Sequence, residues 1–458
     1  MVATSPPAPA GPASHAAHAR AVLVLGLPLI GSHVAQMSLH VIDVLMLGWY
    51  SVEALAAVVL GTSLFFALFI MGSGFAWAVM PLVAHAAASG DDTELRRVTR
   101  MGLWLSTAFA VAILPLMWWS GAILRAMGQE PALAALTQDY LRIAGFGMIP
   151  ALLVMVLKSH LAALERTRMV LWVTVTAAVA NVGVNWVFIF GNLGAPEMGV
   201  RGAAMASVVV ATVSVVALGL HAGLAPGLRG HTLFVRLWRP DPRAMAQVFR
   251  LGWPIGLTNL AESGLFAASS LLMGWIGTRE LAAHGIALQV VSVLFMVQMG
   301  LSNAATVRAG RALGRGDALG LWRGAVVVTA LSLGFALTTV GLLLAVPEAL
   351  VGVFMAPDDP ERAAVIALGA AMLAVAALFQ LFDAAQVVVL GLLRGVQDTR
   401  VPMLLATVSY WLVGIPLSWA LAFPLGWGPQ GIWLGMAIGL AVAALTMSAR
   451  FWRRLPRG

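Results

Sequence analysis

Charge is scarce in this sequence, and cysteine is absent from it. Only 10% of the 458 residues are charged, against about a quarter in ordinary soluble proteins, whereas 60% are hydrophobic and the mean hydropathy is +0.92. So little charge excludes a separate soluble domain, and the absence of cysteine excludes disulfides, thiolate metal sites and thiol redox chemistry. We therefore expect an all-α protein that crosses a membrane many times.

The signatures of an enzyme are missing as well. The chain has no H-E-x-x-H and no G-x-S-x-G motif, which argues against an intramembrane protease or lipid hydrolase. His33 and His40 share a helix face but stand roughly 10 Å apart along it. One zinc ion, with bonds of about 2 Å, cannot join them. We expect neither catalysis nor a bound cofactor.

Hydrophobic runs long enough to cross a bilayer, roughly 20 residues each, recur about a dozen times. They leave an N-terminal tail, residues 1–19, which contains four prolines and no Lys or Arg and is predicted to be disordered. We place twelve spans at 21–49, 54–80, 101–124, 136–160, 169–191, 200–224, 246–275, 281–307, 324–347, 362–393, 402–423 and 430–449.

Basic residues gather in the loops on one side of these spans. The side that holds both termini carries nearly all of the 27 Lys and Arg residues. Because cytoplasmic loops are enriched in Lys and Arg, both termini are predicted to be cytoplasmic, in a bacterial inner membrane. The net charge of +8 is therefore a topology signal, and we expect no nucleic-acid binding. The exceptions on the other side are Arg125, Arg142, Arg201, Arg279 and Arg362.

The chain also repeats itself. LPLIGSHVAQ (27–36) aligns with WPIGLTNLAE (253–262), and LGWYSVEALAA (47–57) aligns with MGWIGTRELAA (273–283), at the same offset. Each half holds six spans, an even number, so the halves share one orientation and are related by an axis along the membrane normal, with a site between them. The predicted domains are an N-terminal six-helix bundle at 20–224, a cytoplasmic linker at 225–245 and a C-terminal six-helix bundle at 246–458.

Three acidic residues lie inside predicted membrane spans, where a charged side chain is energetically unfavourable. Of the 19 carboxylates, all but Asp43, Glu262 and Asp383 fall in loops or at span ends. A carboxylate at the centre of a membrane costs roughly 2.5–3.5 kcal/mol on insertion scales, which favours a function over a packing role. No Lys or Arg is predicted deep inside a span, and an uncompensated buried carboxylate takes up a proton or binds a cation. Oxygen ligands suit a proton or a hard monovalent cation.

Each acid has polar neighbours on its own helix face. Ser32, Gln36, His40 and Asp43 follow one another at helical spacing and form one stripe. A stripe that contains an acid indicates a water-filled cavity, whereas interhelical hydrogen bonds of ~0.6 kcal/mol each are the alternative for the others. The remaining polar candidates lie on the fifth, seventh, eighth and tenth spans: Asn181, Asn185, Thr258, Asn259, Gln289, Ser292, Gln380 and Gln386.

These segments resemble the multidrug and toxic compound extrusion (MATE) transporters, and the NorM-like branch in particular. The resemblance covers the whole chain except the tail. It implies two six-helix bundles in a V, which export lipophilic organic cations in exchange for sodium ions or protons. We expect a monomer whose partners are cationic drugs and the lipid bilayer. The matching segments are VIDVLMLG in the first span, LGWPIGLTNLAESGLFA in the seventh, MGLSNAATVRAGRALGRGD after the eighth, FDAAQVVVLGLLRGVQDT in the tenth and NVGVNWVFIFGNLGAPEMGVRGAA across the fifth and sixth.

The resemblance also implies roles for the buried polar residues. Glu262 and Asp383 match carboxylates that are implicated in cation binding in the second bundle. If sodium is the coupling ion, it is expected at these two residues. Asp43 matches the family's first-helix aspartate and is a third candidate for coupling-ion binding. Asn181 and Asn185 match its fifth-helix polar cluster.

Two further matches concern the helix backbone and an aromatic position. Pro28 matches a proline at which the first helix is thought to bend, and Pro254 occupies the same place in the second half. Phe379 stands where some relatives carry a tyrosine. This removes a hydroxyl ligand, although an aromatic face remains for cation–π contact.

A lipid-linked oligosaccharide flippase of related architecture is the alternative function. Its anionic pyrophosphate substrate would call for Arg or Lys inside the bundle, whereas the predicted spans offer only acids. The physiological substrate, the choice between sodium and proton, the ion-to-drug ratio and the residues that line the drug cavity all stay open at this level.

Overall fold

A computed structural model of the chain describes residues 14–455, apart from the side chain of Val52. All regular secondary structure in this range is helical. Residues 1–13 of the predicted tail lie outside the described residues, but the end of that prediction is wrong. Helix α1 begins at His15, because the hydroxyl of Ser14 accepts a hydrogen bond from the amide of Ala17, 3.2 Å away, and so caps the helix.

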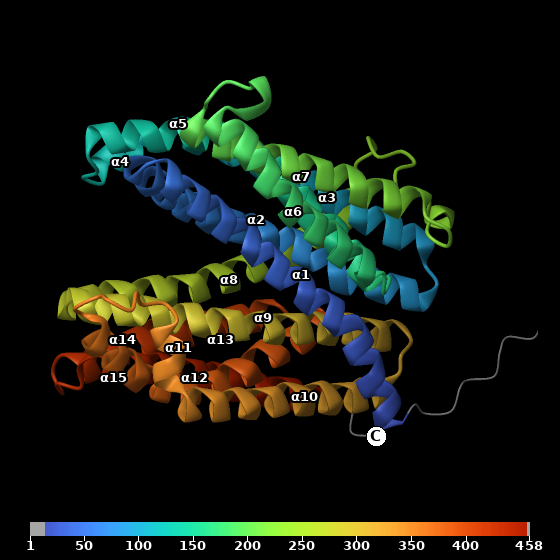
Figure 1. The fold of residues 1–458 in the computed structure, drawn as a ribbon. Helices are drawn as coiled ribbons and strands as arrows, with labels where there is room; N and C mark the ends of the chain where they lie inside the picture. The colour runs from blue at the N-terminus through green and yellow to red at the C-terminus, as the bar shows by residue number, and fades with distance from the viewer. Residues whose placement is uncertain (1–13, 456–458) are drawn as a thin grey trace, which may run out of the picture.

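The helices form two bundles joined by a linker (Figure 1). The linker, between α7 and α8, contains one short helix, η2 (Arg229–His231). The short α4 (Ser120–Ala126) and η1 (Asn192–Gly194) connect long helices of the N-terminal bundle. The long helices of that bundle are α1 (His15–Tyr50), α2 (Val52–Ser89), α3 (Asp92–Trp118), α5 (Pro131–Ala163), α6 (Thr167–Phe190) and α7 (Gly199–Leu224).

The C-terminal bundle has a similar set of long helices, one of which contains a π-helical turn. Its eleventh predicted span is made of α13 (Arg400–Thr407), a π-helical turn η3 (Val408–Gly414) and α14 (Ile415–Ala422). Pro416 follows the π-helical turn and lacks the amide that an α-helix would use there. The other helices of this bundle are α8 (Pro242–Ile276), α9 (Thr278–Gly314), α10 (Ala318–Ala345), the short α11 (Pro347–Gly352), α12 (Arg362–Gly395) and α15 (Gly428–Arg454).

Among the described residues, 11 helices are long and apolar enough to cross a membrane. The remaining predicted span is α8, whose 35 residues give it sufficient length but which falls short of the same apolarity. Thr258, Asn259 and Glu262 interrupt its apolar stretch. The helix that departs most from an ordinary membrane span is therefore one that carries a predicted site residue.

Equivalent turns in the two halves are built in the same way. Gly90 and Gly316 both adopt left-handed backbone conformations, with φ of 75° and 65°. Each is followed by an aspartate that caps the next helix: Asp91 accepts from the amide of Glu94 at 2.9 Å, and Asp317 accepts from the amide of Gly320 at 2.7 Å. The glycine allows the positive φ and the aspartate satisfies a free amide, so the sequence repeat specifies the same turn twice.

The bundles contact each other along a seam near the basic end, by which we mean the end that carries most of the Lys and Arg residues. They diverge towards the end that carries α4 and α11 (Figure 1). In the seam, the backbone of α2 at Gly74 lies directly against the backbone of α8 at Gly252 and Gly256, so that a side chain on Gly74 would overlap it. An ion pair of 2.9 Å between Arg311 and Glu165 also joins the bundles.

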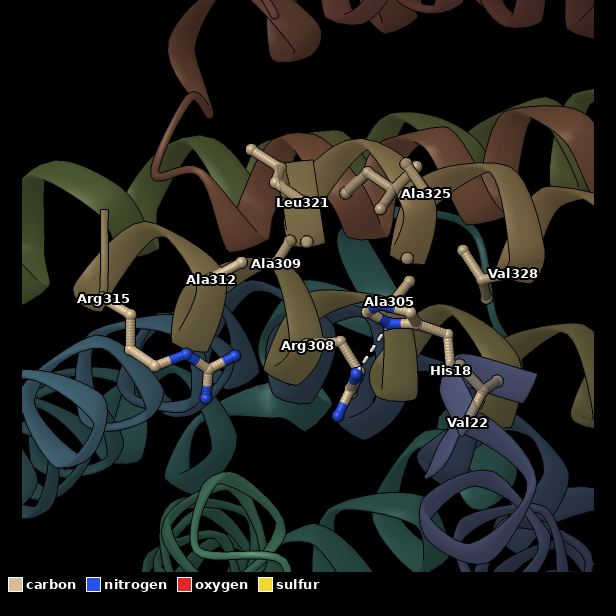
Figure 2. Close-up of a pocket in the computed structure, with 13 residues that line it drawn as sticks. His18, Val22, Ala305, Arg308, Ala309, Ala312, Arg315, Leu321, Ala325 and Val328 are labelled. Carbon is tan, nitrogen blue, oxygen red and sulfur yellow. Dashed lines mark hydrogen bonds between the residues drawn. The ribbon is translucent and has the colours of Figure 1, made fainter. Parts of the chain in front are cut away.

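The start of α1 extends the seam by crossing to the C-terminal bundle (Figure 2). Arg308 of α9 donates a hydrogen bond of 2.8 Å to Nδ1 of His18, whose side chain is buried. Apolar side chains such as Val22, Leu321 and Val328 line the remaining hollow, which holds only about 10 Å³, the room of one water molecule. Direct contacts therefore close the space between the two bundles at this point.

We predict that Gly74→Ala loosens this closure. The added methyl group meets backbone atoms that cannot rotate away, and overpacking of this kind costs about 1–3 kcal/mol, enough to shift a two-state equilibrium roughly 5- to 150-fold. The chain has no cysteine, so Ala305→Cys, buried beside the seam, can report the change. Its maleimide labelling rate should rise with Gly74→Ala and stay unchanged with Gly334→Ala, where a methyl group meets open space. Equal rates in both variants would contradict the seam.

Candidate functional site

Asp43 lies inside the N-terminal bundle, where α1 meets α6 and α7. Its Oδ1 accepts hydrogen bonds from Nδ2 of Asn181 at 2.7 Å and from Nδ2 of Asn185 at 2.6 Å. Its Oδ2 accepts a longer hydrogen bond, 3.3 Å, from the hydroxyl of Ser207. The three residues that the sequence singled out therefore meet, and Ser207, which it missed, joins them. All three donors are neutral, so the carboxylate is solvated by dipoles and is not cancelled by a base.

The rest of the α1 stripe runs from a buried position at Ser32 to exposed positions at Gln36 and His40. Ser32 shares a hydrogen bond of 3.2 Å with Thr174 of α6. Gln36 accepts a hydrogen bond of 2.7 Å from Nζ of Lys158 of α5. His40 is exposed, next to Asp43 in the stripe. The side chains of the predicted stripe thus make three separate contacts: Ser32 with α6, Gln36 with α5, and Asp43 with α6 and α7.

A second cluster lies inside the C-terminal bundle and is short of hydrogen-bond partners. Asp383 on α12 is 1% exposed, and neither of its carboxylate oxygens has a partner among residues 14–455. Oε1 of Glu262 on α8 is also buried without a partner. Neither acid forms an ion pair with the described part of the chain. Glu262 lies close enough for its charge to act on Asp383.

The neighbours of these acids share the same deficit. Gln380 and Gln386 are fully buried on α12, and both polar atoms of each amide lack a partner within the described range. Each unsatisfied buried polar group costs about 1–3 kcal/mol, so a concentration of them in one place is the signature of a site that binds water, ions or a ligand. Carboxylate, amide and hydroxyl oxygens are ligands for a hard cation.

Tyr410 was missed by the sequence analysis. Its side chain is fully buried in the π-helical turn η3, and its hydroxyl has no hydrogen-bond partner among the described residues. The charges of both Glu262 and Asp383 act on it. The sequence did hold a signal, because Pro416 removes a backbone hydrogen bond inside the eleventh predicted span and π-helical turns occur frequently at functional sites.

Two basic side chains reach polar groups inside the bundles, although the sequence predicted none deep inside a span. Arg394, assigned to a loop from the sequence, is 5% exposed in the last turn of α12. Its Nη2 donates a hydrogen bond of 2.6 Å to Oδ1 of Asn259, and its guanidinium lies 5.5 Å from the ring centre of Trp77 across the seam. Its charge acts on Glu262 without direct contact. Lys158, at the end of the fourth predicted span, contacts Gln36 within the N-terminal bundle.

An aromatic wall adjoins the second cluster. Phe379, one turn before Asp383, is fully buried, and its ring packs edge-on against Phe266 at 6.0 Å and Trp433 at 5.6 Å. Trp433 in turn contacts the ring of His284. Phe379 therefore contributes to the packing that holds α8, α12 and α15 together around Asp383.

The remaining candidates are one half-buried glutamine and the two prolines inside helices. Gln289 of α9 is half-buried. Pro28 and Pro254 lie inside the continuous helices α1 and α8, and the carbonyl of Pro254 accepts a hydrogen bond of 2.8 Å from the hydroxyl of Thr258. The structure thus separates the three predicted acids into two sites. Asp43 belongs to the N-terminal bundle, and Glu262 with Asp383 belongs to the C-terminal bundle.

Comparison with known proteins gives a consistent result. The family model MatE matches residues 28–187 and again 254–420, one match in each half. A protein of Agrobacterium fabrum named as probable multidrug resistance protein NorM is 46% identical over 97% of this chain and 95% of its own length. A protein of Rhizobium meliloti with the same name is 45% identical over 96% and 94%. The solved structure of an outward-facing multidrug resistance MATE family transporter superposes with a TM-score of 0.87, at 18% identity, over 96% of both chains.

We predict that Asn185→Ala destabilises the N-terminal bundle by removing the shortest hydrogen bond to Asp43. Hydrogen bonds to charged groups contribute about 1.5–3 kcal/mol, so the free energy of unfolding should fall by that amount. The matched control is Asn192→Ala, which removes a bond of 3.0 Å to a backbone carbonyl in an exposed loop. Thermal unfolding of the purified protein measures both. If the effects of Asn185→Ala and Asp43→Asn on the free energy of unfolding are additive, the two side chains do not interact. The assignment of Asn185 to the cluster around Asp43 would then be wrong.

Proposed function

The chain belongs to the MatE family of multidrug efflux transporters, and from that premise we propose that it exports lipophilic organic cations by antiport with sodium ions or protons. It is a transporter and not an enzyme. The observation that carries the proposal is the pair of buried carboxylates, Glu262 and Asp383, which have no ion-pair partner among the described residues. Such a pair attracts cations.

The proposed orientation places the basic end in the cytoplasm of a bacterial cell, with both termini on that side. The bias of Lys and Arg towards this end supports it. Because the bundles pack together at the basic end and diverge at the other, the conformation is then an outward-facing one. A cation released from the C-terminal bundle in this state would leave to the outside.

For the coupling ion we propose a site made by Glu262, Asp383 and Tyr410, with the amides of Gln380 and Gln386 beside them. Phe379 has no hydroxyl, but Tyr410 offers one from a neighbouring helix. A sodium ion would be bound by the carboxylate, amide and hydroxyl oxygens, whereas a proton would bind to a carboxylate directly. Arg394 is held away from Glu262 by Asn259 and Trp77, so it biases the site without occupying it.

The transport cycle follows from competition for the same negative charge. With the cavity open outwards, coupling ions neutralise Glu262 and Asp383 and the organic cation leaves. After the bundles reorient, the ions dissociate into the cytoplasm and the free carboxylates bind the next organic cation. Mutual exclusion of two ligands is a reciprocal coupling, so each weakens the binding of the other by the same factor.

The membrane potential constrains the stoichiometry. It supplies ~2.3 kcal/mol per elementary charge per 100 mV, but an exchange of one monovalent ion for one monovalent drug moves no net charge. Export driven by voltage therefore needs at least two ions for each drug. Glu262 and Asp383 together offer two carboxylates for them.

The flippase alternative is not favoured by the interior of the bundles. Arg394 and Lys158 each already contact an amide oxygen, that of Asn259 or that of Gln36. The buried Arg100 donates to a backbone carbonyl of the linker. The unpartnered groups concentrate instead around Asp383. A site whose acids lack partners and whose bases are already hydrogen-bonded suits a cationic substrate.

We predict that Glu262→Gln and Asp383→Asn each abolish ion-driven export of a fluorescent organic cation from proteoliposomes, because an amide carries no charge to exchange. Sodium and proton gradients imposed separately identify the coupling ion. If sodium couples, Tyr410→Phe should weaken its apparent affinity about tenfold, the equivalent of roughly 1.4 kcal/mol. Glu348→Gln, which neutralises an exposed carboxylate on α11, is the control and should export normally. Unchanged export by either of the buried-site variants would overturn the proposal.

A further inference from the structure

An open pocket of about 390 Å³ lies at the basic end of the C-terminal bundle, away from both clusters of acids. It is formed where α8 begins and where the turn between α12 and α13 returns the chain. Three arginines line it: Arg243 and Arg250 from α8, and Arg400 from α13. None of the three side chains forms an ion pair or a hydrogen bond with the described residues.

The single carboxylate in the pocket is already neutralised. Asp398 accepts two hydrogen bonds from Arg450, at 2.6 and 3.2 Å, and one of 2.9 Å from Arg454. Two arginines that reach it from α15 thus leave the three pocket arginines uncompensated. Gln247, Gln397 and Thr399 also line the pocket and offer neutral hydrogen-bond donors beside the guanidinium groups.

The other half of the chain provides an internal comparison. The same turn there carries Thr167 and Arg168 where this one has Thr399 and Arg400. At the offset that relates the two halves, however, Arg243 and Arg250 correspond to Ala17 and Val24 of α1. The repeated fold therefore does not require basic residues at these two positions of the helix.

We propose that this pocket binds the phosphate of an anionic phospholipid headgroup from the inner leaflet of the membrane. Guanidinium groups pair with phosphate oxygens through two parallel hydrogen bonds, and basic pockets at the cytoplasmic ends of membrane helices suit such headgroups. The pocket lies where α8 and α13 begin, beside the predicted starts of the seventh and eleventh spans. Trp238, on the adjoining linker and 75% exposed, has the character of a residue at a membrane interface. The assignment to the inner leaflet rests on the proposed orientation.

Lipid binding to the full-length protein in a neutral detergent tests the proposal without any transport assay, so its outcome is independent of the efflux function. Native mass spectrometry and thermal unfolding are recorded with phosphatidylglycerol, with phosphatidylcholine and with inorganic phosphate. The wild type should bind and be stabilised by phosphatidylglycerol in preference to phosphatidylcholine. Arg243→Gln, Arg250→Gln and Arg400→Gln combined should weaken that binding at least about tenfold.

The matched control combines Arg168→Gln, Arg229→Gln and Arg239→Gln, which remove the same charge from exposed positions at the same end. It should bind phosphatidylglycerol within about twofold of the wild type. If both triple variants lose phosphatidylglycerol binding equally, the effect is one of general charge and the proposed pocket is wrong. If inorganic phosphate alone stabilises the protein against thermal unfolding as much as phosphatidylglycerol does, the ligand is not a lipid headgroup. If the pocket triple variant does not fold, Arg250→Gln alone, compared with Arg168→Gln, decides between the same outcomes.

Discussion

A buried carboxylate without a base is the constraint on which the rest of this structure depends. Asp383 lies inside the C-terminal bundle with both oxygens unpartnered among the described residues, and Glu262 lies close enough to act on it. We propose that the surrounding packing fixes this pair in place and that a mobile cation completes it. The packed rings of Phe266, Phe379 and Trp433 provide the fixed part.

The two bundles differ in the hydrogen-bond partners that they provide for their buried acids. Asp43 is surrounded by neutral donors from Asn181, Asn185 and Ser207, so its charge is satisfied within the protein. The C-terminal acids are left open. This asymmetry within a repeated fold supports the proposal that the C-terminal acids exchange the coupling ions, whereas Asp43 keeps its hydrogen-bond partners within the N-terminal bundle. The glycine-lined seam at Gly74 lets the bundles meet backbone to backbone, an interface that a few added atoms would disrupt.

Much of this architecture could be predicted from the sequence, because hydropathy and the internal repeat depend on many residues at once. The polar stripe on α1 and the pair of asparagines on α6 were found from helical spacing alone. Arg394 was placed wrongly, because its position near a span end does not reveal that the helix continues to Gly395 with its guanidinium turned towards Asn259. Tyr410 was missed because a π-helical turn changes which side chains point inwards, and residue spacing read at 3.6 per turn cannot register that change. The sequence predicted a site between the two halves, whereas the acids lie within the bundles, and that difference is a matter of tertiary packing.

The most direct test of the account is equilibrium binding of a fluorescent organic cation to the purified protein at increasing concentrations of sodium ions or protons. The account predicts that one of these ions weakens binding of the organic cation in a saturable manner, and that the organic cation weakens binding of that ion by the same factor. In the variant with both Glu262→Gln and Asp383→Asn, this competition should disappear. The claim is that the coupling ion and the organic cation compete for these two carboxylates. It would be contradicted if the competition persists undiminished in the double variant, or if neither ion affects binding of the organic cation to the wild type.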